Sequence, residues 1–388
     1  MFGISSGHKR VKNVVVVDIG STSAAVAIIA LHGSEPATVI AAERLQLPLE
    51  ERTQEATMIG VGGVLKTAGE NVQKKFVASN QKKNVAIHGV SVIVHTPWCN
   101  SKTSRMNAVF EKDTVITGKI ISDLAQKALK SQGVDTKNLL EANVIRVELN
   151  GYPSGKPIGK RAREVVVHVL SSDFASGMRS TLEEALQSIF PHSAPVFRSA
   201  TRVAITVLNE EDNPIHDYLL VDVESEGTTF TAVHSGVPTG HEIAPLGVQT
   251  IVKKISGPGL PEDTLSQFRM LAKDQCSDPA CEDIKASIAR AEPEIVRIFG
   301  EAMSKSATPR RLPDALILMT HPDMFSWLSN LFSRIDFAQF TLTTQPFMLR
   351  KLHMQDLDAV SQGKMGIVED SGLALGIQFA CIEQTMLK

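Results

Sequence analysis

The stretch of sequence that decides the fold runs from Asn13 to Leu31 and reads Asn-Val-Val-Val-Val-Asp-Ile-Gly-Ser-Thr-Ser-Ala-Ala-Val-Ala-Ile-Ile-Ala-Leu. It opens with a β-branched run, Val14 to Val17, which is interrupted by Asp18 and Gly20. Apolar residues resume at Val26 to Ile29. Because apolar runs on either side of small turn residues are typical of buried strands, this stretch predicts two strands joined by a tight turn.

The predicted turn has the composition of a phosphate-binding loop. Gly20 allows a sharp change of chain direction, and Ser21, Thr22 and Ser23 offer amides and hydroxyls on which a phosphate group can rest. Asp18 ends the first strand and is placed to hold a hydrated Mg²⁺ ion. The alternative is an ordinary hairpin with a polar turn, since short glycine and serine turns are common.

A second stretch in the other half of the chain has the same design. Residues Tyr218 to Val233 form an apolar run that reaches Asp222, a small-residue turn, and a returning apolar run. Gly227, Thr228 and Thr229 lie where the turn leads into the returning strand. The sequence therefore predicts two aspartate-ended hairpins, each with turn residues suited to phosphate.

Two such hairpins, one in each half, resemble the layout of the actin, Hsp70 and sugar-kinase superfamily. Within it the chain is similar to the bacterial FtsA and PilM group of actin-like ATPases. The resemblance implies an α/β, actin-like (ribonuclease H-like) two-domain fold whose phosphate loops face each other across a cleft. It also implies ATP and Mg²⁺ as cofactors, with the metal ion held through water by Asp18 and Asp222. The cofactor-binding residues expected from the resemblance are Asp18, Gly20, Ser21, Thr22, Asp222, Gly227, Thr228 and Thr229.

Composition narrows the class of protein. The chain has 388 residues, which predicts two or three domains. Its formal net charge of -2 gives no reason to expect nucleic-acid binding. Four scattered cysteines suit a reducing compartment, and the sequence has neither a membrane-length apolar run nor the apolar core of a signal peptide. These features predict a cytoplasmic protein.

Residues 84–171 are expected to form a separate α+β domain inserted into the first half. A Gly- and Pro-rich segment, 150–163, joins two alternating strands, and the pattern of Pro-Ile-Gly followed by a strand ending in Val-His-Val resembles the inserted SHS2-type domain of FtsA. That domain takes part in protein contacts. The basic residues of the segment would then meet an acidic partner, or they form a solvated loop; they are Lys156, Lys160, Arg161 and Arg163.

The remaining chain is divided on the same grounds. We expect a leader at 1–12, the first part of actin-like domain I at 13–83, its second part at 172–210, domain II at 211–349 and a return to domain I at 350–388. Apolar spacing predicts helices at 54–76, 117–131, 174–190, 199–208, 260–272, 278–304, 322–332 and 371–384. Further strands are predicted at 37–47, 85–95, 107–110, 143–149, 164–170, 194–197, 242–245, 314–320 and 340–343.

Several departures from the family pattern put nucleotide chemistry in doubt. Met319-Thr320-His321-Pro322 stands where the family's adenine loop has Thr-Gly-Gly, so an amide and both glycines are lost. Glu224 and Glu226 place two carboxylates in the second phosphate loop, where they repel a polyphosphate unless Mg²⁺ intervenes. Weak binding, a vestigial site and competent hydrolysis all stay open, and any enzyme activity is expected to be at most a slow ATPase.

The resemblance implies a cytoplasmic scaffold that assembles a membrane-associated machine, for cell division or type IV pilus assembly, through protein contacts. The chain stops at Lys388 without the terminal amphipathic helix of FtsA, so we expect it to be recruited to the inner face of the cell membrane by a peptide of a membrane protein. Self-association is a further alternative. The competing hypothesis is an active ATPase or small-molecule kinase of the same superfamily.

Overall fold

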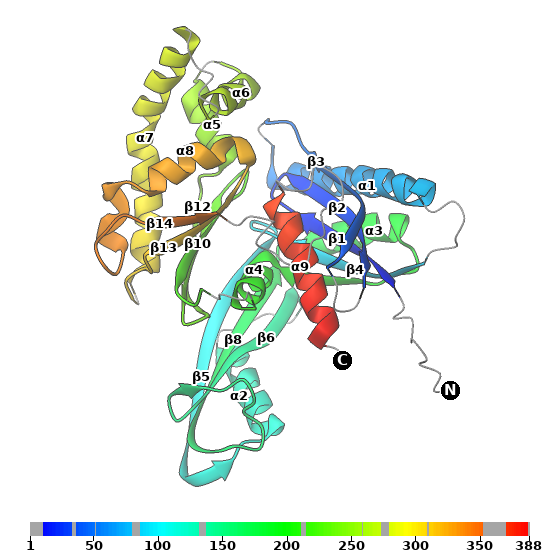
Figure 1. Ribbon diagram of the computed structural model, residues 1–388, viewed down its shortest axis with the longest axis vertical. Coiled ribbons are helices and arrows are strands. Elements are labelled where there is room, and N and C mark those ends of the chain that lie inside the picture. The colour runs from blue at the N-terminus through cyan, green and yellow to red at the C-terminus, as the bar shows by residue number, and fades with distance from the viewer. Residues whose placement is uncertain are drawn as a thin grey trace, which may run out of the picture. The chain divides into compact units, whose positions relative to one another are not determined.

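The computed structural model describes residues 11–32, 36–50, 52–79, 86–131, 137–210, 215–257, 259–272, 279–308, 310–351 and 370–386. The chain divides into two compact units, which are described separately (Figure 1). Unit 1 comprises 1–95, 177–212 and 352–388, and unit 2 comprises 96–176 and 213–351. Of the segments expected from the sequence, residues 1–10 of the leader and 352–369 of the C-terminal return lie outside the described residues.

Unit 1 is built on a five-stranded sheet in the order β3-β2-β1-β4-β9. Its strands are β1 (Lys12–Ile19), β2 (Ser23–Leu31), β3 (Thr38–Gln46), β4 (Ile87–Val94) and β9 (Pro195–Ser199). The predicted first hairpin is confirmed, because β1 and β2 pair antiparallel with Asp18 opposite Ala25. Strands β4 and β9 add to the other side of β1 in parallel.

Helices cover the sheet of unit 1 on both faces. The helices are α1 (Gln54–Ser79), α3 (Met178–Ile189), α4 (Ala200–Asn209) and α9 (Ser371–Met386). Helix α1 packs on β2, β3 and α3, whereas α9 packs on β1, β2, β4 and α4 (Figure 1). Successive residues Val15, Val16 and Val17 of β1 are all fully buried, as expected for a strand covered on both sides. Ser199 caps α4, since its hydroxyl accepts a hydrogen bond from the amide of Arg202.

Strand β4 corrects one expectation. We expected the strand at 85–95 to belong to the inserted domain that begins at residue 84, but β4 pairs with β1 in the sheet of unit 1. Its residues Val92, Ile93 and Val94 are buried in succession, so it is an inner strand rather than a half-exposed one. The chain leaves unit 1 after His95 and returns at Gly177.

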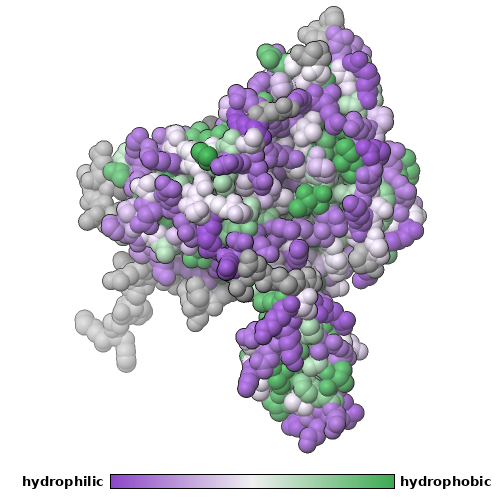
Figure 2. All heavy atoms as spheres, turned by 180° about the vertical axis from the view of Figure 1, so that it is seen from behind, coloured by the Kyte–Doolittle hydropathy of each residue, from purple (hydrophilic) through white to green (hydrophobic). Residues whose placement is uncertain are grey.

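Residues 96–176 of unit 2 form an antiparallel sheet in the order β5-β8-β6-β7, with one helix packed on it. The elements are β5 (Cys99–Val115), α2 (Gly118–Ser131), β6 (Leu139–Leu149), β7 (Tyr152–Pro153) and β8 (Arg161–Phe174). Leu124 and Ala128 of α2 pack with Val147, Val165 and Val167 of the sheet. Figure 2 shows apolar residues among polar ones on the surface of this part, which lies lowest in the view. The exposed apolar side chains include Val109, Tyr152 and Ile158.

Residues 213–351 of unit 2 contain a second five-stranded sheet, in the order β12-β11-β10-β13-β14. Its strands are β10 (Tyr218–Val223), β11 (Thr228–His234), β12 (Val237–Ala244), β13 (Ala315–Thr320) and β14 (Met348–Lys351). As in unit 1, three strands pair antiparallel and two more add in parallel, so the second hairpin is also confirmed. The helices are α5 (Val248–Ser256), α6 (Pro261–Ala272), α7 (Pro279–Ser306), α8 (Pro322–Phe332) and the 3₁₀ helix η1 (Ile335–Phe340).

The strand expected at 340–343 is absent from this described sheet. Phe340 ends η1, and Thr341 makes only an isolated bridge to Leu312. The hydroxyl oxygen of Thr341 lies 2.8 Å from the carbonyl oxygens of both Ala338 and Gln345, which share its one O–H donor, and this holds the segment in a compact turn. Phe337 is drawn into the aromatic core with Phe332, at a ring separation of 5.6 Å, and this burial accounts for the helical turn.

The helices that the structure describes include none with both the length and the apolar character required to span a lipid bilayer.

Candidate functional site

The first turn, residues 20–23, is tight and largely buried. The amide of Gly20 donates to the carbonyl of Ser23 at 2.9 Å, which closes the hairpin. The amide of Leu47 donates to the carbonyl of Thr22 at 2.9 Å and so holds the turn against the chain that follows β3. Ser21 and Thr22 are buried. The structure therefore brings Asp18, Gly20, Ser21 and Thr22 together, as the sequence predicted for one loop.

Both carboxylate oxygens of Asp18 accept hydrogen bonds from side chains of unit 1. Nε2 of His95, the residue that follows β4, lies 2.8 Å from Oδ1, and Nη2 of Arg44, on β3, lies 2.6 Å from Oδ2. Burial alone would raise the pKa of Asp18, but the attraction and hydrogen bonds of His95 and Arg44 outweigh it and hold that pKa far below its usual value. Asp18 is therefore ionised, and Nε2 of His95 donates to it.

Arg44 joins Asp18 to a second carboxylate. Its Nε and Nη2 atoms donate to the two oxygens of Asp370 at 2.6 and 2.7 Å, and its Nη1 atom donates to the hydroxyl of Ser23 at 2.9 Å. Burial would lower the pKa of Arg44, but Asp370 and Asp18 raise it above the usual value, so the guanidinium stays charged. Asp370 also accepts from the amide of Leu373 at 3.0 Å, which caps the start of α9.

Gly372 allows the first turn of α9 to lie directly against Asp18. A Cβ atom at position 372 would be 2.6 Å from Oδ2 of Asp18 and 3.0 Å from its Cγ. Only glycine leaves room for the carboxylate at this point. Glycine at this position, the Arg44 bridge and the Asp370 cap together fix the start of α9 to the end of β1.

The second turn, residues 224–227, is closed mainly by backbone groups. The amide of Glu224 donates to the carbonyl of Gly227 at 2.9 Å. The first amides of α5 then donate to the turn, Val248 to the carbonyl of Glu224 at 2.8 Å and Gln249 to that of Ser225 at 2.9 Å. The amides at the start of α5, which offer an anion-binding site in many proteins, are here occupied by carbonyls of the chain.

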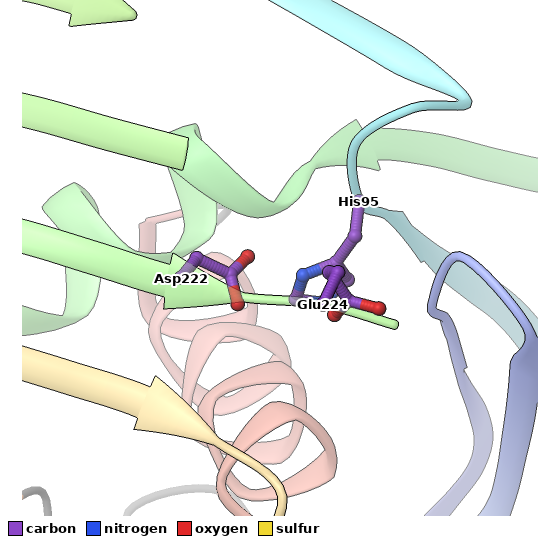
Figure 3. Close-up of side chains that lie close together, drawn as sticks. All are labelled: His95, Asp222 and Glu224. Carbon is purple, nitrogen blue, oxygen red and sulfur yellow. The ribbon is translucent and has the colours of Figure 1, made fainter. Parts of the chain in front are cut away.

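The remaining predicted residues of the second turn lie at its base. The hydroxyl of Thr228 donates to the carbonyl of Leu246 at 2.6 Å in a buried bond. Asp222 and Thr229 face each other across the β10 and β11 pair. Figure 3 shows the side chains of Asp222 and Glu224 where β10 ends, and that of His95 just after β4. The structure therefore brings Asp222, Gly227, Thr228 and Thr229 together at one turn of unit 2.

The segment expected to replace the adenine loop is a strand-to-helix step. Strand β13 ends at Thr320, and Nδ1 of His321 accepts a hydrogen bond from the amide of Asp323 at 3.3 Å to cap α8. Pro322 occupies the first helical position, where the missing amide costs no helical hydrogen bond. The sequence at this point serves helix initiation in place of a glycine-rich loop.

Arg44, His95 and Asp370 were not predicted from the sequence to belong to the site. A signal was present for two of them. Arg44 is a charge within an otherwise strand-like segment, and Asp370 directly precedes an apolar helix, which is the pattern of a helix cap. The pairing itself was not predictable, since Arg44 and Asp370 are 326 residues apart.

Whether a hydrated Mg²⁺ ion fits the first loop depends on the oxygens of the ionised Asp18. The oxygens that would accept hydrogen bonds from the water shell of the ion already accept from Arg44 and His95. A divalent ion in this place would also be repelled by the guanidinium. The described residues of the first loop therefore do not fit the metal ion as they stand.

Comparison with known proteins places the fold. No family model matches the sequence, and no curated protein matches it. Among solved structures, a chain of the PilM–PilN type IV pilus biogenesis complex is similar over 95% of this chain and 98% of its own length, with a TM-score of 0.63 and 12% identity. The chain has an actin-like fold of the PilM type.

Two other solved structures with lower scores align along most of the chain. The ethanolamine utilization protein EutJ from Carboxydothermus hydrogenoformans has 10% identity and a TM-score of 0.46, with 94% of this chain and 88% of that chain covered. A PPX-GPPA enzyme from Aquifex aeolicus has 11% identity and a TM-score of 0.36, with 97% and 94% covered. The expected actin-like α/β fold class is thus confirmed by the PilM-type similarity.

Proposed function

We propose that this protein is an actin-like scaffold of the PilM type that assembles a membrane-associated machine through protein contacts and binds ATP weakly or not at all. The observation that carries the proposal is the occupied carboxylate of Asp18, which Arg44 and His95 contact at hydrogen-bonding distance. A protein that depends on Mg²⁺ and ATP at this loop would have to open these contacts in every binding event.

The cost of opening them sets the expected affinity. The side chain of Asp18 is 3% exposed and that of Arg44 is 31% exposed, so the pair is intermediate between surface and buried ion pairs. Such a pair is worth about 2 to 3 kcal/mol. If that energy is lost when the metal ion binds, affinity falls by roughly 30- to 150-fold. Weak nucleotide binding follows without any change in fold.

The second loop adds to this penalty. The carbonyls of its turn accept hydrogen bonds from the first amides of α5, and the hydroxyl of Thr228 donates to the carbonyl of Leu246. Glu224 and Glu226 bring negative charge to the same turn. Donors that are already used, and carboxylates that repel phosphate, both reduce the electrostatic stabilisation on which phosphoryl transfer depends. We therefore propose at most a slow ATPase activity.

Similarity to a chain of the PilM–PilN complex supports a protein partner. We propose that the partner is a short peptide of a membrane protein and that the chain is recruited by it to the inner face of the cell membrane. Assembly of a type IV pilus is the machine favoured by this similarity, and cell division is the alternative. We propose that each unit keeps a weak cofactor-binding loop. The residues are Asp18, Gly20, Ser21 and Thr22 in unit 1 and Asp222, Gly227, Thr228 and Thr229 in unit 2.

The nucleotide part of the proposal is tested by calorimetry of ATP with Mg²⁺, together with turnover on a panel of phosphate acceptors. We expect weak or undetectable binding, and slow or no turnover, with any residual binding abolished by Asp18→Ala combined with Asp222→Ala. Submicromolar ATP affinity, or rapid phosphoryl transfer to one acceptor, would overturn it in favour of an ATPase or kinase.

The recruitment part is tested by flotation of the whole protein with two kinds of membrane. We expect binding to native membranes stripped of peripheral proteins, loss of that binding after protease treatment of the membranes, and little binding to plain anionic vesicles. Equal binding to plain vesicles and native membranes contradicts a protein anchor.

A further inference from the structure

We propose that Arg44 is a built-in cation that takes the place of a divalent metal ion between the carboxylates of Asp18 and Asp370, and thereby holds α9 against the first loop without a ligand. The inference rests on the proposed loss of tight nucleotide binding, and it names the residue responsible. It assigns the misfit between Mg²⁺ and the first loop to one side chain.

The guanidinium of Arg44 is almost fully coordinated by the protein. Arg44 has five N–H groups, and four of them are directed at acceptors in unit 1. Two reach both oxygens of Asp370, one reaches Asp18 and one reaches the hydroxyl of Ser23, at 2.6 to 2.9 Å. This is the paired, planar recognition of carboxylates for which arginine is suited. A guanidinium held in this way is a fixed part of the site.

The charge of Arg44 balances that of the two carboxylates. Asp18 and Asp370 bring two negative charges to one place, and Arg44 lies between them. Two carboxylates that share a cation are a common environment for a divalent ion. Because the guanidinium already supplies positive charge there, a metal ion would have to displace it against direct repulsion. The wild-type protein should therefore have little affinity for divalent ions at Asp18.

Arg44 also joins three elements of unit 1. It lies on β3, Asp18 lies on β1, and Asp370 caps the first turn of α9. Gly372 in that turn lies so close to Asp18 that an added Cβ atom would be 2.6 Å from Oδ2 of Asp18. The packing of α9 and the position of the Asp18 carboxylate are thus mutually dependent. Arg44 holds both in the arrangement that a bound ligand would otherwise have to stabilise.

The experiment measures Mn²⁺ binding by loss of the free-ion electron paramagnetic resonance signal, without nucleotide and then with ATP. The test variant is Arg44→Gln, which removes the charge and keeps much of the side-chain length. The matched control is Arg52→Gln in the same unit, because Arg52 also pairs with a carboxylate, that of Glu50, and donates to the carbonyl of Pro48, and the bonds of its side chain do not include Asp18 or Asp370. Arg44→Gln with Asp18→Asn shows whether any new binding uses Asp18.

We expect weak Mn²⁺ binding by the wild type and by Arg52→Gln, and an affinity at least about tenfold higher for Arg44→Gln that is lost in the double variant. A folded Arg44→Gln protein, judged by circular dichroism, with unchanged Mn²⁺ affinity would overturn the proposal. So would Mn²⁺ binding by the wild type that is as tight as that of Arg44→Gln and is removed by Asp18→Asn.

Two measurements keep the test decisive if Arg44→Gln does not fold. In the wild type, Mg²⁺ should raise the unfolding temperature no more than NaCl of equal ionic strength, because Arg44 fills the site; a specific stabilisation by Mg²⁺ contradicts this. Arg44→Lys keeps the positive charge and should leave Mn²⁺ affinity close to that of the wild type, whereas a rise of about tenfold in a folded Arg44→Lys protein contradicts the proposal.

The outcomes separate this inference from the proposed function. Tight ATP binding by the wild type would refute the scaffold with a vestigial site. Weak ATP binding by the wild type, with no gain of Mn²⁺ binding in folded Arg44→Gln, would leave that function standing and refute only the role of Arg44.

Discussion

The two aspartate-ended hairpins have the same pairing but are closed by different means. Around the first turn, the side chains of Arg44 on β3 and of His95, just after β4, bond to Asp18, and Gly372 of α9 packs against it. Around the second turn, backbone amides of α5 bond to backbone carbonyls of residues 224 and 225. A repeated sequence pattern thus specifies the hairpin and leaves its closure to residues elsewhere in the chain.

The difference determines what each turn is sensitive to. Closure by ion pairs depends on charge and pH, because the partners must stay ionised. Closure by backbone groups depends instead on close packing, because an added side-chain atom would push the bonded backbone groups apart. Four predictions test this contrast.

The largest effect is expected at Gly247, beside the second turn. A Cβ atom there would overlap the carbonyl oxygen of Glu224 and lie 2.5 Å from the amide nitrogen of Gly227 and the carbonyl oxygen of Ser225. Backbone atoms cannot rotate away, so Gly247→Ala should reduce the free energy of unfolding by roughly 3 to 5 kcal/mol. Urea denaturation measures it.

Gly300→Ala is the matched control in the same unit. The added methyl would meet only the ring of Phe340, at 3.8 Å, and lie within α7. We expect it to be neutral or to stabilise by about 0.5 to 1 kcal/mol. If both variants lost a similar free energy of unfolding, close packing at Gly247 would not explain its effect.

The next effect is expected at Gly372, beside the first turn. The methyl of Gly372→Ala would push the Asp18 carboxylate from Arg44 and His95. A side chain can yield where backbone cannot, so we expect a smaller loss of about 2 to 3 kcal/mol. Thermal unfolding is compared with Gly63→Ala, whose methyl would have no atom within 4 Å. If Gly372→Ala lost as much free energy of unfolding as Gly247→Ala, the proposed difference between closure by side chains and closure by backbone groups would be wrong.

The third prediction concerns pH. Asp18→Asn keeps the shape of the side chain and removes its charge, which should cost about 2 kcal/mol at pH 7. The pKa of Asp18 is lowered in the folded protein, so its stabilising effect is present above the unfolded pKa of about 4 and declines as pH falls below it. Denaturation at pH 7 and at pH 3 should show the difference between wild type and variant shrinking with acid. A difference that grows with acid would show that Asp18 is not held by cations.

The smallest effect is expected at Thr228. Thr228→Val removes a buried donor from the carbonyl of Leu246 and should cost about 1 to 2 kcal/mol, with no dependence on pH between 4 and 8. Thr308→Val removes a bond of the same kind, to the carbonyl of Ser304, at an exposed position and should be close to neutral. Chemical denaturation of the two variants compares them, and a strong pH dependence for Thr228→Val would mean that charge also closes the second turn.

Much of the fold could be predicted from the sequence because hydrophobic periodicity is a local property. The hairpins at Asp18 and Asp222, and helices such as 371–384, follow from runs of apolar residues. The strand at 85–95 was assigned to the wrong sheet, since strand character does not identify the partner strand. At 340–343 the burial of Phe337 overrode local strand character.

The candidate site was predicted less completely for a physical reason. Residues within one turn, such as Gly20 and Ser21, are neighbours in sequence, so their grouping is readable. Arg44 and His95 reach Asp18, and Asp370 reaches Arg44, only through the folded sheet and helix. Ion pairs of this kind follow no period, and a single sequence carries no signal that links their members.

Helix α9 has a consequence for how the protein is made. Strand β1 emerges early in synthesis, yet the helix that covers it is encoded by residues 371–386. At 5 to 20 residues per second, roughly 20 to 70 s pass between them. During that time the residues of the sheet that lie against α9, including Val16 and Ile93 beneath Gly376, are not yet covered by it. Unit 2, whose described residues end at 351, has all of its strands before α9 appears. On the ribosome the first unit to begin is therefore the last to be completed.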